Sequence, residues 1–137
     1  MPVIDYQTQN SMDARVIKHD QSLERYTDER CHILESWNDP RDPDVAIARA
    51  RVEPGVTTAR HVLEVDERYL ITSGHGRAEV EGLDATDVSA GDVVVIPAGR
   101  AQRIANTGES DLVFYCVCTP RFEQRHYHGH DVEGAKS

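Results

Sequence analysis

At 137 residues, the chain is long enough for a single domain whose core needs no disulfide or structural metal. Its formal net charge of −9 at pH 7 argues against nucleic acids and anionic membranes as partners, because phosphate contacts need clustered Lys and Arg. No apolar run approaches the roughly 18–20 residues of a membrane span, and no basic segment followed by an apolar one opens the chain, so we expect a cytoplasmic protein.

The first predicted strand follows a polar N-terminal arm, residues 1–27, which could add an edge strand to a partner. Residues 31–37 are expected to form a strand that ends at a loop rich in Pro and Asx, residues 38–43. Residues 45–52 alternate between small apolar residues and a second set that includes arginines. That period of two predicts a strand with one buried face.

Short segments of β type continue along the chain, separated by turns that contain glycine, proline or asparagine. We expect further strands at residues 59–65, 68–73, 77–81, 92–96, 102–105 and 111–118. No segment shows a sustained helical period. Strands this short and this regularly spaced predict an all-β sandwich or barrel over residues 28–122. The remaining residues, 123–137, form a polar tail whose histidines we expect to bind metal only adventitiously.

Two blocks of the sequence carry the strongest motif. The first has Gly55, His61, Glu67 and Gly74, and the second has Gly91, Pro97, Gly99 and Asn106. At these spacings the two blocks resemble the paired motifs of the cupin superfamily. Leu63 and Gln102 stand where that superfamily usually has histidines. The resemblance extends over residues 28–122 and is closest to small single-domain cupins of the cupin 2 type.

This resemblance implies a double-stranded β-helix, or jelly-roll barrel, with a divalent metal in its mouth. If His61 points inward, alternation places Glu67 and Tyr69 on the same inner face, with Gln102 on the facing strand. The implied metal ligands are His61, Glu67 and Gln102, for Fe, Mn, Ni or Zn. Tyr69 is the candidate catalytic residue, as a proton donor.

Two functions remain open at this point. The first is a metal-dependent enzyme, such as a dioxygenase, isomerase or lyase, that acts on a small carboxylated or hydroxylated molecule. The second is a non-catalytic module that binds a small ligand without metal, in which His61, Glu67 and Gln102 form a hydrogen-bonded network. The family resemblance also suggests a homodimer.

Other polar residues have weaker claims to a role in the barrel. The three cysteines are expected to be reduced, and they could replace the missing donor together with His32; they are Cys31, Cys116 and Cys118. Four arginines flank the motif strands and could clamp a carboxylate, although most are expected to be solvated outside the barrel. They are Arg49, Arg51, Arg60 and Arg103.

Overall fold

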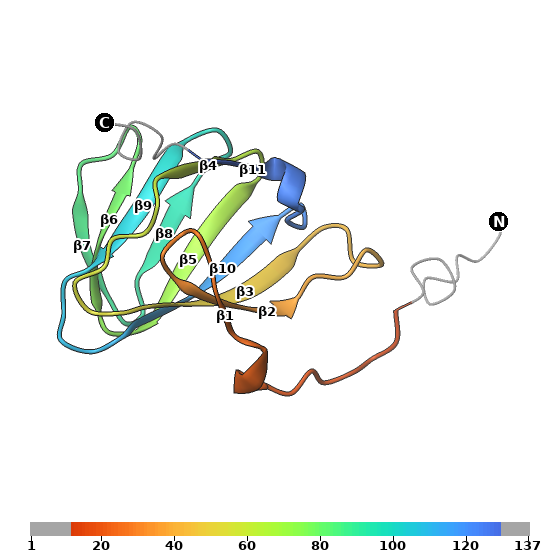
Figure 1. The fold of residues 1–137 in the computed structure, drawn as a ribbon. Helices are drawn as coiled ribbons and strands as arrows, with labels where there is room; N and C mark the ends of the chain where they lie inside the picture. The colour runs from red at the N-terminus through yellow and green to blue at the C-terminus, as the bar shows by residue number, and fades with distance from the viewer. Residues whose placement is uncertain (1–11, 130–137) are drawn as a thin grey trace.

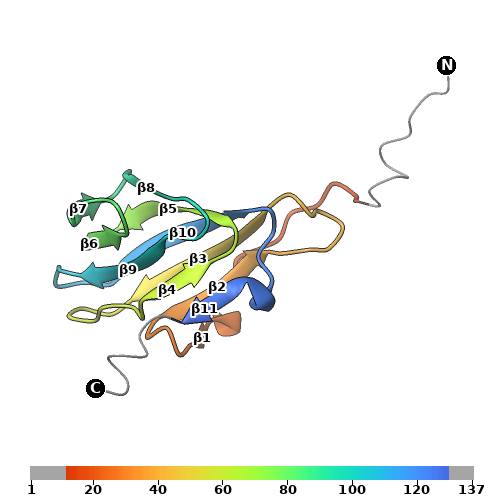
Figure 2. The same ribbon diagram turned by 90° about the horizontal axis from the view of Figure 1, so that it is seen from above.

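The computed structural model describes residues 12–129, and its strands form two antiparallel sheets (Figure 1). The first sheet has the order β1 (Arg25–Tyr26), β2 (His32–Trp37), β3 (Ala46–Val52), β10 (Leu112–Thr119), β5 (Asp66–Ser73) and β8 (Val93–Ile96). The second has the order β11 (Tyr127–Gly129), β4 (His61–Leu63), β9 (Ala101–Asn106), β6 (His75–Val80) and β7 (Thr86–Ser89). Seen from above, the two sheets form the two walls of one barrel (Figure 2). The predicted all-β jelly roll is confirmed.

The strands predicted from alternation are all present, most with shifts of a residue or two at their ends. β4 covers only His61–Leu63, a shorter stretch than the expected 59–65. Three short strands, β1, β7 and β11, were not predicted, and neither were two single-turn 3-10 helices, η1 (Gln21–Leu23) and η2 (Gln124–His126). In the part of the chain that the structure describes, no helix is long and apolar enough to cross a membrane.

Motif residues hold the turns between strands. Gly74 has a φ of +89°, and a Cβ there would lie 2.6 Å from the carbonyl oxygen of Asp111, so only glycine fits. The Asn106 side chain donates to the carbonyl oxygens of Val52 and Ser110, at 2.8 Å each. It also accepts from the backbone N–H of Gly108. One amide thus ties three chain segments together at the end of β9, which explains the need for asparagine at this position.

The core fills the space between the inner faces of the two sheets. Its largest cluster contains side chains of both sheets, among them Val52, Ile71, Ile104, Leu112 and Phe114, all at most 2% exposed. A second, smaller cluster closes one end of the barrel and contains Ala46, Leu63, Val65 and Cys118, with Phe122 and Tyr127 packed against it. Both clusters leave an open cavity beside them, described below.

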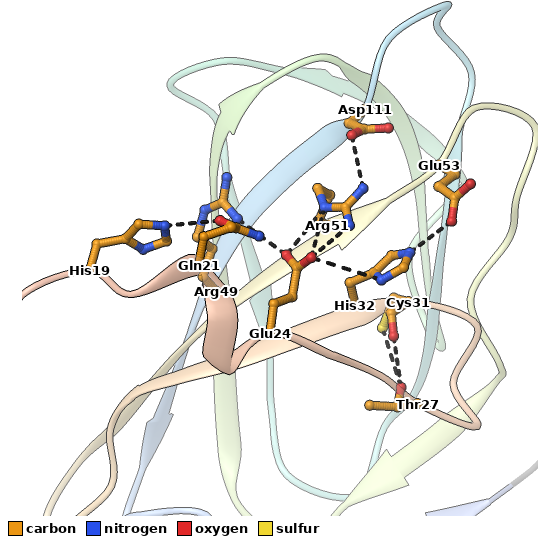
Figure 3. A network of polar contacts seen from close by, with 10 residues as sticks. All are labelled: His19, Gln21, Glu24, Thr27, Cys31, His32, Arg49, Arg51, Glu53 and Asp111. Carbon is orange, nitrogen blue, oxygen red and sulfur yellow. Dashed lines mark hydrogen bonds and ion pairs between the residues drawn. The ribbon is translucent and has the colours of Figure 1, made fainter.

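The outer face of the six-stranded sheet holds the segment before β1 through a network of charges (Figure 3). Arg51 donates to Glu24 at 2.6 Å and to Asp111 at 3.1 Å, and Arg49 lies 3.4 Å from Glu24. His32, on the same face, contacts Glu53 at 2.7 Å. Arg49, Arg51 and His32 therefore lie outside the barrel and do not line the cavity. Hydrogen bonds from Arg51 hold the pKa of Glu24 below its ordinary value.

The ends of the described chain pair with the barrel of the same molecule: β1 pairs with β2, and β11 pairs with β4. His126 is buried, and its Nδ1 accepts from the backbone N–H of Glu123. His128 pairs with Glu64 at 2.5 Å. These two histidines thus have structural partners. His130 and the arm before residue 12 lie outside the described residues, and the division into arm, barrel and tail stays a prediction.

Candidate functional site

A cavity of about 410 Å³ opens between the two sheets. Its wall comes from β2, β3, β4, β5 and β10, from residues 25–29, and from the segment at 122–127. His61, Glu67 and Tyr69 all line it, as alternation predicts. Gln102 is 1% exposed and lies behind the wall. The structure therefore brings three of the four predicted site residues to the cavity and places the fourth in the next layer.

His61 enters the cavity from β4 with its ring oriented by two contacts. Its Nδ1 donates to the carbonyl oxygen of Ala59 at 2.9 Å, since a carbonyl only accepts. Its ring stacks on Tyr127, with centroids 5.0 Å apart and planes at 21°. Among residues 12–129, Nε2 has no hydrogen-bond partner. The neutral ring therefore presents a lone pair on Nε2, which suits either a proton or a metal ion.

Glu67, on β5, is the buried acid of the site. One oxygen, Oε2, accepts from the Cys118 thiol at 3.7 Å, and the other, Oε1, has no partner within residues 12–129. Burial raises the pKa of Glu67 to about 6, while the nearby His61 and the Gln102 amide act in the opposite direction. Its carboxyl group can therefore gain and lose a proton near neutral pH.

The Tyr69 hydroxyl donates to Oε1 of Gln102, which is the residue opposite His61 in the neighbouring strand. Burial raises the pKa of Tyr69, so its hydroxyl keeps the proton. Gln102 Nε2 has no hydrogen-bond partner among the residues described. The Tyr69 proton is directed at Gln102 and away from the cavity. Tyr69 would have to break this bond before it could donate to a ligand.

Leu63 is buried against Ala46, Val65 and Cys118 at the end of the barrel. It provides apolar packing where a nitrogen donor would complete the usual ligand set. Across residues 12–129, no group of three or more His, Cys, Asp and Glu side chains is placed to hold a metal ion. Of the predicted ligands, His61 and Glu67 line the cavity and could each offer a metal ion one donor, while the carbonyl of Gln102 would have to supply the third from behind the wall. That carbonyl retains a second lone pair beside the bond from Tyr69.

The three cysteines are free and line the cavity. Burial raises the pKa of Cys31 to about 12 and raises the pKa of Cys116 and Cys118 as well. All three therefore remain protonated thiols at neutral pH. A protonated thiol is a weak ligand and a weak nucleophile, so their role in the resting site is packing and weak hydrogen bonds, from Cys118 to Glu67 and from Cys31 to Glu29.

Sequence reasoning missed several residues of the wall. Glu29 reaches the cavity from the loop before β2, and its carboxylate contacts the Cys31 thiol at 3.8 Å. Tyr127, Phe122 and Tyr26 come from the two ends of the described chain. No motif marks any of them. Tyr127 reaches the cavity because β11 pairs with β4, which lies far away in the sequence, whereas Tyr26 and Glu29 come from β1 and the turn between β1 and β2.

A family model described as a cupin domain matches residues 48–118, just over half of the chain. No curated protein matches this chain. Among solved structures, an uncharacterized conserved protein with a double-stranded β-helix domain from Klebsiella pneumoniae aligns with a TM-score of 0.69 and 17% identity, covering 85% of this chain and 97% of that one.

Two further solved structures are enzymes. Oxalate decarboxylase from Bacillus subtilis aligns with a TM-score of 0.71 and 19% identity, covering 83% of this chain and 31% of that one. The Streptomyces protein Pac13, a nucleoside dehydratase, aligns with a TM-score of 0.68 and 14% identity, covering 85% of this chain and 92% of that one. At these identities the similarity shows a shared fold.

Proposed function

This chain belongs to the cupin domain family, and we propose that it binds a small polar molecule in the cavity between its sheets, against His61 and Glu67. One observation carries the proposal. Among residues 12–129, Oε1 of Glu67 is a buried polar atom without a hydrogen-bond partner and Nε2 of His61 makes no hydrogen bond, and both residues line a cavity of about 410 Å³. An unpaired buried carboxylate oxygen costs free energy, so a ligand that supplies a donor there is bound favourably.

The same pair can move protons. A carboxyl group with a pKa of about 6 exchanges its proton near neutral pH, which suits general acid–base catalysis. His61 offers a second acceptor at Nε2. An isomerase or lyase reaction needs only such groups, and dehydration by Pac13 is a reaction of that kind on a similar fold. We therefore favour proton-transfer chemistry, with Tyr69 as a donor only if its bond to Gln102 opens.

A divalent metal bound by His61, Glu67 and Gln102 is the second candidate. The orientation of His61 supports it, because metal-binding imidazoles commonly donate their other ring N–H to a carbonyl. Such a metal would polarise an oxygen of the bound molecule. His61 and Glu67 would be the stronger donors, and Gln102 would add its free carbonyl lone pair.

The proposal is tested by NMR titration of the ¹⁵N-labelled chain with a panel of small polyols and hydroxy acids. Binding is expected to shift the amides of β4, β5 and β10. Ala48→Phe, which places a ring in the cavity, should abolish these shifts, whereas Val95→Phe on the exposed outer face should leave them unchanged. Shifts that survive Ala48→Phe would place the ligand elsewhere and overturn the proposal.

A further inference from the structure

The charged side chains that line the cavity are mostly acidic. Four are carboxylates, and Arg25 is the one guanidinium among them; the carboxylates are Asp28, Glu29, Glu35 and Glu67. Arg25, Asp28 and Glu35 are exposed, so water screens their charges. Glu67 is 6% exposed, so its charge is screened much less. The buried part of the cavity is therefore negative whenever Glu67 is ionised.

Three buried side chains of the wall, His61, Glu67 and Tyr69, can only accept a hydrogen bond from a ligand while their present contacts last. Glu67 is more than nine-tenths buried, and its Oε1 has no hydrogen-bond partner in the described part of the chain. His61 uses its Nδ1 proton on Ala59, which leaves Nε2 of the neutral ring as an acceptor. The Tyr69 hydroxyl gives its proton to Gln102. A ligand that reaches this depth must therefore supply the protons for these hydrogen bonds itself.

Aromatic rings form much of the remaining wall. Five of the eight aromatic side chains of the chain line the cavity, namely Tyr26, Tyr69, Phe114, Phe122 and Tyr127. Tyr69 and Phe114 pack together with centroids 4.4 Å apart, and Tyr127, on the other sheet, stacks on His61. The faces of aromatic rings attract cations as well as apolar groups.

From these observations we infer that the cavity takes a small amine in its protonated form, with the ammonium group against Glu67 and His61 and the carbon skeleton between the rings. The inference rests on the proposed function, because it names the charge of the molecule bound at the same site. It runs against a carboxylated ligand, since a third carboxylate beside Glu67 and Glu29 would add repulsion between like charges.

A divalent cation would also be attracted by this charge. The aromatic wall favours the amine, because ring faces and a buried leucine at position 63 offer a metal ion no donor. Titrations are therefore run with a chelator present, so that any preference for a cation is measured without metal.

The test uses three probes that share one ring and differ in charge: cyclohexylammonium, cyclohexanol and cyclohexanecarboxylate. Their affinities are measured by NMR titration of the whole chain at about pH 7.5, where both Glu67 and the amine are charged. Cyclohexylammonium is expected to bind about tenfold more tightly than cyclohexanol, because a charged hydrogen bond replaces a neutral one. The carboxylate is expected to bind weakest.

Three variants assign the preference to the cavity. Glu67→Gln keeps the shape of the side chain and should lower the preference for the ammonium over the alcohol by about tenfold. Glu29→Gln, which is half-buried, should lower it less. Glu53→Gln, on the outer face, should leave it unchanged.

The inference is overturned if cyclohexanol or the carboxylate binds as tightly as the ammonium, or if the ammonium causes no shift at the cavity. In the first case the cavity still binds small molecules, and the proposed function stands without its preference for a cation. If all three probes fail while the polyols and hydroxy acids bind, only the inference is lost. If both sets fail, the proposed function is lost with it.

Discussion

The hydroxyl of Tyr69 donates its proton to the side-chain carbonyl of Gln102, across a sequence separation of 33 residues. Gln102 stands where a cupin usually has a ligand histidine, and Tyr69 lies two residues after the motif glutamate. The bond therefore links the two motifs directly. Tyr69, the candidate proton donor, gives its proton to Gln102, the weakest of the candidate metal ligands.

Removing this hydroxyl should cost stability. Tyr69→Phe leaves both polar atoms of the buried Gln102 amide without a partner, and we expect a loss of about 1–3 kcal/mol in the free energy of unfolding. Urea denaturation measures it. The matched control is the double variant Tyr69→Phe/Gln102→Met, in which no polar atom is stranded. If the double variant loses as much free energy of unfolding as Tyr69→Phe and Gln102→Met lose together, the two side chains are not coupled.

The buried carboxyl of Glu67 should make stability fall as pH rises. Its pKa is raised from an ordinary 4.5 to about 6 in the folded chain, so the folded state holds a proton that the unfolded state has released. The free energy of unfolding therefore falls by about 2 kcal/mol between about pH 4.5 and 6. Glu67→Gln should lack this loss, so its stability relative to the wild type should rise over that range.

This prediction is measured by urea denaturation of both proteins at several pH values, where the shared titrating groups cancel in the difference. Glu79→Gln, whose carboxylate pairs with Arg103 on an outer face, is the matched control. A difference between wild type and Glu67→Gln that stays constant across the range would show that Glu67 is not shifted by burial.

Gln102→His should strengthen metal binding. An imidazole nitrogen is a better ligand for Zn²⁺ or Ni²⁺ than an amide oxygen that already accepts from Tyr69. We expect affinity to rise about tenfold or more, measured by calorimetry on protein without a purification tag. His61→Ala should abolish binding in both backgrounds. His128→Ala serves as the control for adventitious binding at the tail, and an unchanged affinity in Gln102→His would mean that position 102 does not face the metal.

Glu24 should anchor the segment before β1. Its side chain is only 7% exposed, but the Arg51 and His32 side chains that cover it are themselves partly exposed. Solvent screening therefore weakens the ion pairs that Glu24 makes with them. Glu24→Gln is expected to cost about 1–2 kcal/mol and to speed hydrogen exchange in β1. Because the pKa of Glu24 is lowered, its contribution is present above the ordinary value and lost as pH falls through the folded value.

Glu53→Gln is the control for this network, since the Glu53 side chain is 55% exposed and pairs with His32 rather than with Arg51. It should change the free energy of unfolding by well under 1 kcal/mol. Equal losses in the two variants would mean that the segment is held by its backbone pairing with β2 rather than by Glu24.

The local pattern of the sequence was sufficient for the fold and for three residues that line the cavity, His61, Glu67 and Tyr69. Alternation has a period of two, so once His61 points inward, Glu67 and Tyr69 follow on the same inner face, as observed. Glycine at 74 is required by its positive φ, whatever lies around it. β7 escaped prediction because its four residues are mostly polar, and only pairing with β6 makes them a strand.

What the tertiary structure decided is which polar groups meet. The same alternation that turns Gln102 inward does not say that Tyr69 will take its carbonyl. Charge alone does not say that Arg51 will face Glu24 outside the barrel while Glu29 enters the cavity. Periodicity determines the face of a strand on which a residue lies, whereas the partner of a buried polar atom depends on segments that are distant in the chain. The local sequence pattern therefore predicts the fold, whereas the chemistry of the cavity depends on contacts between distant segments.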